Sequence, residues 1–159
     1  MLLVPGANVI PLAPSYGEIY ADNVSVALAC TLQNTYYKCI AFASAGLASA
    51  DVTVDTANKR LQVTRAGDYF VSFTHDHVGS VNDNYETTLF AGPAGSTVVK
   101  IAVHGHQRNS SATAVSSVSG SGFVTLAAND TLELWVACTT SAGTNITTES
   151  VFLSLYRVK

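Results

Sequence analysis

The stretch AGDYFVSFTHDH, residues 66–77, decides the fold class of this chain. The pair Ala66-Gly67 indicates a turn, and apolar and polar residues alternate after it. On a β-strand, alternate side chains point to opposite faces of the sheet. The alternation predicts a half-buried strand over 68–77, and the residues expected to share one face are Tyr69, Val71, Phe73, His75 and His77.

The same alternation recurs along most of the chain, and no stretch has the period of an amphipathic helix. Within 126–138, Leu132, Leu134 and Val136 share one face and Trp135 lies on the other. Strands are expected near 18–21, 24–30, 36–43, 51–54, 60–64, 68–77, 85–91, 97–105, 113–126, 131–138 and 149–158, with a turn-like segment at 44–50. Short strands at regular spacing predict an all-β fold, a single jelly-roll β-sandwich over residues 17–159.

The composition favours a protein that assembles with partners. Charged residues make up only 12% of the 159 residues, while hydrophobic residues make up 48%. Interface cores are depleted of charge in the same way. The net charge of −3 and the absence of a basic cluster argue against a nucleic-acid partner. Cys30, Cys39 and Cys138 are an odd count without paired spacing, so we interpret them as core residues in a reducing compartment.

The first sixteen residues differ from the rest of the chain. Three prolines interrupt residues 1–16, which disfavours both a helix and a place inside a sheet. The segment has no basic start typical of a signal peptide and is too short and broken to cross a membrane. We therefore expect an extended N-terminal arm that folds back on its own domain or docks on another protein through apolar side chains, namely Leu2, Leu3, Val4, Val9, Ile10 and Leu12.

Three segments in this order resemble the tumour-necrosis-factor-like jelly roll, which includes the globular heads of complement-type collagenous proteins. They are the strand AGDYFVSF (66–73), the Gly/Ser-rich lead and turn between 120 and 134, and the final strand VFLSLY (151–156). The resemblance covers roughly residues 55–158. The earlier segments GEIY (17–20) and QNTY (33–36) are similar to modules of this fold in tailed-phage virion proteins.

The resemblance implies a homotrimer that packs around aromatic faces. The candidate interface residues are Tyr69, Phe73, Trp135, Phe152 and Tyr156. The sequence has no collagen-like stalk, which argues against an animal signalling role. We expect a phage capsid decoration (cement) protein: a trimeric knob on the capsid surface of the virion, present in the host cytoplasm during assembly, whose arm binds the major capsid protein.

The alternative is the receptor- or glycan-binding head of a phage tail fibre or spike. The loops 79–84 and 106–112 would then read a host-surface glycan, and Tyr36, Tyr37 and Tyr85 would stack on sugars. Core or trimer packing is the competing interpretation of these tyrosines. The number of copies in each virion separates the two roles, because decoration needs hundreds and a tail tip needs a handful.

All four histidines of the chain stand in two His-x-His pairs. Residues i and i+2 of a strand point the same way, and imidazole suits Zn, Ni, Cu or Fe. A site formed by His75, His77, His104 and His106 is therefore one interpretation, and histidines that end two strands at one pole of the knob are the favoured one. Asp76 and Asp83 show no ordered calcium loop. No cofactor is expected.

Enzymatic activity is not expected. The sequence contains no G-x-S-x-G elbow, no phosphate-binding loop and no dinucleotide fingerprint. The Ser121 of GSG (120–122) is better explained as part of a flexible lead into a strand than as a nucleophile. Paired catalytic carboxylates stay open at this point, because strands bring distant Asp and Glu residues together.

Overall fold

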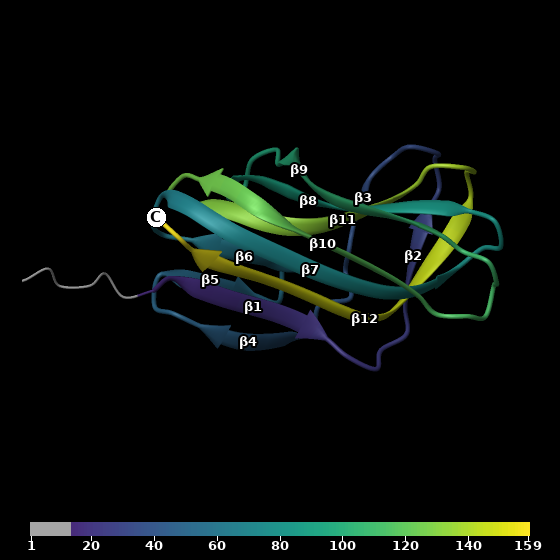
Figure 1. The fold of residues 1–159 in the computed structure, drawn as a ribbon, viewed down its shortest axis with the longest axis horizontal. Coiled ribbons are helices and arrows are strands. Elements are labelled where there is room, and N and C mark those ends of the chain that lie inside the picture. Colours follow the sequence, from purple (N-terminus) through teal and green to yellow (C-terminus); the bar gives the residue numbers. More distant parts are fainter. Residues whose placement is uncertain (1–13) are drawn as a thin grey trace, which may run out of the picture.

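The computed structural model describes residues 14–159, and within them the chain forms twelve β-strands (Figure 1). None of these residues belongs to a helix that could cross a membrane. The strands are β1 (Tyr16–Ala21), β2 (Val26–Cys30), β3 (Tyr37–Lys38), β4 (Ser44–Ala48), β5 (Val52–Asp55), β6 (Arg60–Val63), β7 (Gly67–Gly79), β8 (Asn84–Pro93), β9 (Val99–Arg108), β10 (Ser116–Leu126), β11 (Asp130–Cys138) and β12 (Thr144–Arg157).

Two antiparallel sheets pack face to face as a sandwich, which confirms the predicted fold class. Sheet A has the strand order β10-β7-β12-β1-β4, and β2 also pairs with β12. Sheet B has the order β5-β6-β11-β8-β9, and β3 also pairs with β11. Many neighbours, such as β1 and β12 or β7 and β10, are distant in sequence, so side chains from remote segments meet on each face.

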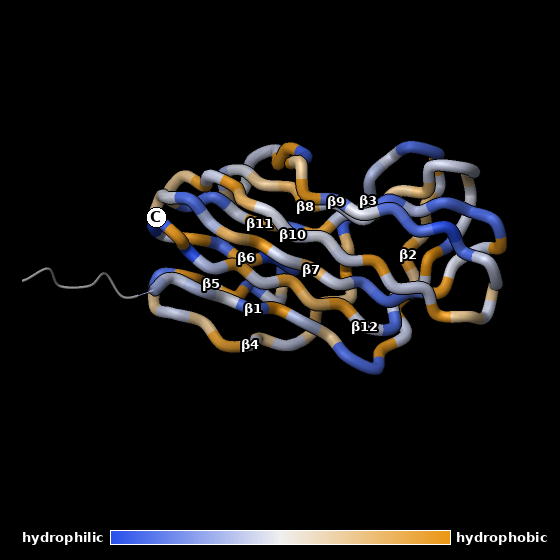
Figure 2. The backbone as a smooth tube through the Cα atoms, in the orientation of Figure 1, coloured by the Kyte–Doolittle hydropathy of each residue, from blue (hydrophilic) through white to orange (hydrophobic). Residues whose placement is uncertain are grey.

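The core lies between the sheets and follows the alternation of the sequence (Figure 2). In β7, Tyr69, Val71 and Phe73 share one face, as the pattern predicted, and all three are at most 1% exposed. The inward sets of β11 and β12 are also buried: Leu132, Leu134, Val136, Val151, Leu153 and Leu155. Cys30, Cys39 and Cys138 are buried free thiols, as expected of core residues.

Two predicted segments differ in the structure. Residues 44–50 were expected to form a turn, but Ser44–Ala48 forms β4, which pairs with β1 at the edge of sheet A. Their small side chains have weak strand propensity, and pairing with β1 overrides it. A strand was expected over 36–43, but only the two residues of β3 form one, and they pair with Val136 and Trp135 of β11.

Both ends of the described chain lie at one pole of the sandwich (Figure 1). Tyr16 at the start of β1 pairs with Tyr156 near the end of β12, and the amide of Arg157 donates a hydrogen bond to the carbonyl oxygen of Ser15. Ser15 is itself buried, so the sandwich includes residues just before 17. The loops 80–83 and 109–115 are joined by backbone hydrogen bonds at the opposite pole.

Candidate functional site

The outward surface of sheet A carries a row of aromatic side chains. Phe123 of β10 lies opposite Phe70 of β7, which lies opposite Tyr156 of β12, which lies opposite Tyr16 of β1. This register places four rings side by side across four strands. The rings of Phe70 and Phe123 are 5.4 Å apart in an edge-to-face arrangement. We call the surface formed by Phe123, Phe70, Tyr156, Tyr16, Phe152 and Tyr20 the aromatic face.

The aromatic face is open to solvent in the single chain. Phe123 is 72% exposed and Tyr156 is 49% exposed. Hollows of about 380 Å³ and 490 Å³ flank Phe152, and the second is bordered by small residues, among them Ser72, Gly120 and Ser121. Burying an exposed aromatic ring is worth about 2–3 kcal/mol, so a surface that leaves several exposed favours a partner.

The five residues predicted for a trimer interface occupy three different places. Tyr69 and Phe73 lie inside the core of their own chain, so the prediction is wrong for these two residues. Trp135 lies on the outward surface of sheet B, where its ring packs on Phe90 at 4.8 Å. Phe152 and Tyr156 belong to the aromatic face. The alternation placed residues on a strand face correctly, but it could not tell which face turns inward.

His75 and His77 lie inside the sandwich and do not end a strand at its rim. Both are fully buried and their rings stack at 4.8 Å. The two ring nitrogens of His75 pair with the hydroxyls of Thr87 at 3.1 Å and Thr148 at 2.9 Å. The ring nitrogens of His77 have no hydrogen-bond partner among residues 14–159. The expectation that both pairs decorate one pole is therefore wrong for this pair.

Burial favours the neutral form of both rings. It lowers the pKa of His75 to about 3, and repulsion from His77 acts in the same direction. Burial also lowers the pKa of His77, although the His75 backbone, Asp76 and Asn109 oppose the shift. The sandwich therefore holds two histidines that are uncharged when folded and that become charged on unfolding in mild acid.

We expect the free energy of unfolding to fall as the pH drops from about 6.5 to about 5. In this window the unfolded chain binds more protons than the folded chain, so stability rises with pH by up to ~1.4 kcal/mol per pH unit for each histidine. Replacing His77 with Phe should reduce the slope, because it removes one of the two buried rings that take up a proton on unfolding.

Urea unfolding at fixed protein concentration measures this slope. The carboxylates with lowered pKa values, Asp51, Asp55 and Glu86, lose their stabilising effect only below their ordinary pKa values, at lower pH than this window. Equal slopes in the original chain and in His77→Phe would contradict the prediction.

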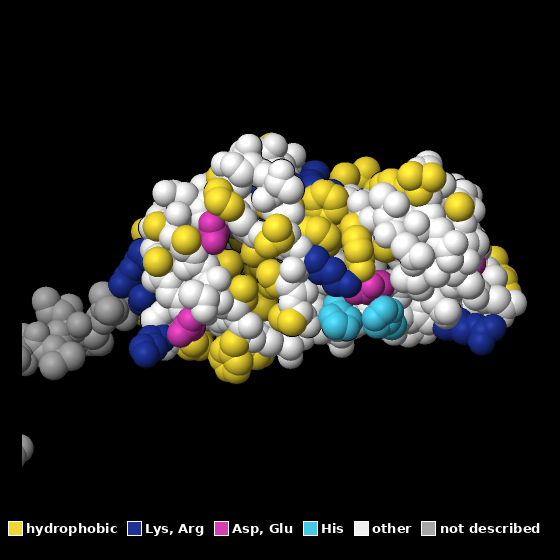
Figure 3. All heavy atoms as spheres, turned by 90° about the horizontal axis from the view of Figure 1, so that it is seen from above, with side chains coloured by type: hydrophobic (Ala, Val, Ile, Leu, Met, Phe, Trp, Pro, Cys, Tyr) yellow, Lys and Arg dark blue, Asp and Glu magenta, His cyan; other side chains and the backbone are white. Residues whose placement is uncertain are grey.

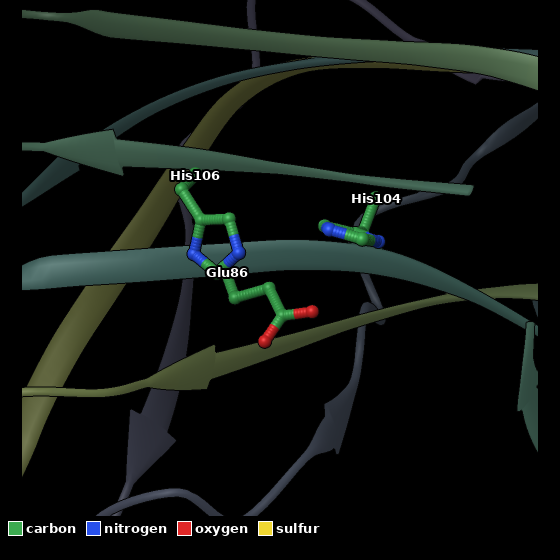
Figure 4. A group of neighbouring side chains, drawn as sticks. All are labelled: Glu86, His104 and His106. Atoms are coloured by element: carbon green, nitrogen blue, oxygen red, sulfur yellow. The ribbon is translucent and has the colours of Figure 1, made fainter. Parts of the chain in front are cut away.

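His104 and His106 project outward from β9 and meet Glu86 of β8. Glu86 lies directly opposite His106 in the strand register. One potential ligand atom from each of the three side chains lies within 4.8 Å of the others (Figure 4). Figure 3 shows histidines gathered beside an acidic and a basic side chain on the surface seen from above. The two histidine pairs thus lie apart, one buried and one exposed.

Glu86 is also the centre of a hydrogen-bonded group. Its carboxylate accepts hydrogen bonds from the Lys100 ammonium and from the Tyr36 hydroxyl, the latter at 2.6 Å. Burial alone would raise the pKa of Glu86, but these two contacts outweigh it and hold the pKa below its ordinary value. Lys100 also lies 4.7 Å from the centre of the Tyr36 ring. The sequence did not predict that Glu86 lies beside His104, His106 and Lys100, because these contacts depend on the register between β8 and β9.

The tyrosines proposed to stack on sugars are not equivalent. Tyr85 is fully buried, and its hydroxyl accepts a hydrogen bond from the amide of Ser80, so the expectation of sugar stacking is wrong for it. Tyr36 and Tyr37 are half-buried, and the Tyr36 ring packs edge-to-face on Phe90. The apolar arm residues Leu2, Leu3, Val4, Val9, Ile10 and Leu12 lie outside the described residues.

Comparison with solved structures identifies the type of fold. A structure of Eiger TNF from S. frugiperda superposes with a TM-score of 0.65 over 92% of this chain and 93% of that one, at 14% identity. Murine APRIL at pH 5.0 superposes with a TM-score of 0.61 over 90% of this chain and 99% of that one, at 9% identity. The chain has a tumour-necrosis-factor-like jelly-roll fold. No protein-family model and no curated protein matches its sequence.

Proposed function

We propose that this chain is a homotrimeric decoration protein that binds and stabilises an assembled phage capsid at the virion surface. The aromatic face is the observation that carries the first part of the proposal. Phe123 and Tyr156 are so exposed that a partner surface is expected to cover them. The fold is similar to trimeric tumour-necrosis-factor-like heads, which supports two further copies of the same chain as the partner.

The shape of the aromatic face supports self-association. Phe123 protrudes from β10, and the hollow beside Phe152 has the small residues Ser72, Gly120 and Ser121 at its border. A protruding ring of one copy and a hollow of the next are the elements of a complementary interface. The few charges of the chain add little desolvation cost to such a contact.

The position of the chain ends supports the second part of the proposal. The residues that follow the arm enter β1 at the pole where β12 ends, so a trimer would present three arms on one side. Three linked contacts raise the effective concentration of each, by ~100-fold or more where the geometry permits. A protein that binds only the assembled lattice stabilises that lattice by mass action.

The direct test uses the full chain and empty capsids of the phage that encodes it. The protein is mixed with capsids, the capsids are sedimented, and bound copies are counted by quantitative mass spectrometry. We expect hundreds of copies in multiples of three and a capsid that resists heating to a higher temperature. The absence of sedimented protein would overturn the proposal.

The receptor- or glycan-binding head stays a second candidate. The loops 80–83 and 109–115 lie together at the pole opposite residues 14 and 159. They are rich in Asn, Ser and Thr, whose side chains can form hydrogen bonds with sugar hydroxyls. A handful of copies in each virion, located at the tail, would favour this role over decoration.

A further inference from the structure

The exposed histidine pair and Glu86 are not used by the proposed function. They lie on the outward surface of sheet B, and the aromatic face lies on sheet A. His104 and His106 are residues i and i+2 of β9, so both rings leave the strand on the same side. Glu86 reaches the same place from β8 (Figure 4). Two imidazoles and one carboxylate are thus held by paired backbones.

The hydrogen bond of His104 orients its free nitrogen. Nδ1 of His104 lies 3.1 Å from the carbonyl oxygen of Ala102, and a carbonyl only accepts. Nδ1 therefore carries the proton, and Nε2 keeps a lone pair. Histidines that bind metals commonly donate their second N–H to a backbone carbonyl in this way. This contact is independent of the clustering of the three side chains.

The carboxylate of Glu86 retains acceptor capacity after its two contacts. Lys100 uses one lone pair of Oε1 and Tyr36 uses one of Oε2, while an ionised carboxylate offers about four. In a tetrahedral ion with bonds of about 2.1 Å, ligand atoms lie about 3.4 Å apart. The separations here are at most 4.8 Å, so rotations of exposed side chains suffice to close the site.

We propose that Glu86, His104 and His106 bind a divalent transition-metal ion of the zinc class. Two imidazole nitrogens and one carboxylate oxygen suit Zn²⁺, and three protein ligands leave a fourth position open to water or to a group of another molecule. The bound ion joins β9, the edge strand of sheet B, to β8. The proposal does not depend on capsid binding or on the trimer.

The test is calorimetric titration of the full chain, stripped with a chelator, with zinc chloride alone. We expect one ion for each chain. Glu86→Gln and His104→Gln should each weaken binding by ~10-fold or more, because each removes one ligand. Lys100→Met should tighten binding by about tenfold, because Lys100 is a cation that competes for the same carboxylate.

The same surface supplies matched controls. Glu133 is as buried as Glu86 and pairs with Lys38 at 2.7 Å, but within residues 14–159 it is not grouped with a histidine. Glu133→Gln and Lys38→Met should therefore leave zinc affinity unchanged. Circular dichroism establishes that each variant folds. If Glu86→Gln does not fold, His104→Gln still tests the proposal. Zinc binding that is absent, or that survives both ligand variants, overturns the proposal.

Discussion

Replacing Phe123 with Asp is expected to abolish the proposed trimer. The particle mass in native mass spectrometry should fall from three times the 16.6 kDa chain mass to one chain mass. Phe123 is the most exposed ring of the aromatic face, and its burial between copies is worth about 2–3 kcal/mol at each of three contacts. An Asp there forfeits this gain and brings a charge that has no partner into an apolar contact.

The control for this prediction separates loss of assembly from added charge. Leu32 is 61% exposed and lies in the loop between β2 and β3, away from the aromatic face, so Leu32→Asp should remain trimeric. Phe123→Tyr, which keeps the ring, should also remain trimeric. Circular dichroism of Phe123→Asp should still report a folded sandwich, because the side chain is outside the core. A trimeric Phe123→Asp would refute the aromatic face as the interface.

Deleting residues 1–13 is expected to abolish capsid binding while the trimer stays intact. The deletion keeps Ser15, whose hydroxyl donates a hydrogen bond to Asp51, and it keeps the whole of β1. In the proposed complex each arm would add apolar contacts with the capsid, and the trimer would strengthen them through effective concentration. Losing three arms would therefore remove this strengthened binding. Sedimentation with capsids measures the loss, and native mass spectrometry measures the trimer.

A variant of full length makes this test sharper. Changing Leu2, Leu3, Val4, Val9, Ile10 and Leu12 to Ser keeps the length of the arm but removes its apolar side chains. It should bind capsids as poorly as the deletion. Loss of capsid binding together with loss of the trimer would point to an arm that assembles the knob. Normal decoration by either variant would refute the arm as the capsid-binding element.

The sequence predicts which residues share a strand face, because that depends only on the period of two. It does not predict which sheet a strand joins. Trp135 and Phe152 each lie on the strand face that points away from the buried leucines of the same strand. They nevertheless belong to different surfaces of the molecule, because β11 is in sheet B and β12 is in sheet A. Tyr69 and Phe73 were assigned to a contact between chains, although the core of one chain already buries them. Aromatic residues suit both environments, so residue type does not separate them.

The histidines show the same limit. The spacing His-x-His predicts that two rings point the same way, and this holds for both pairs. Burial differs because β7 is covered by sheet B on the side that carries His75, whereas β9 presents His104 to solvent. Glu86 joins the second pair only through the pairing of β8 with β9. Strand register depends on contacts between distant segments, which a local pattern does not record.

Both ends of the described residues, 14 and 159, lie at one pole, and this determines where a foreign peptide is best attached to the protein. A peptide fused after Lys159 would emerge beside the start of β1 and compete for space with whatever binds there. A peptide inserted at Ala114, an exposed residue of the loop 109–115, would project from the far pole. On a decorated particle, insertion in that loop would display the peptide outward, whereas a terminal fusion would face the shell.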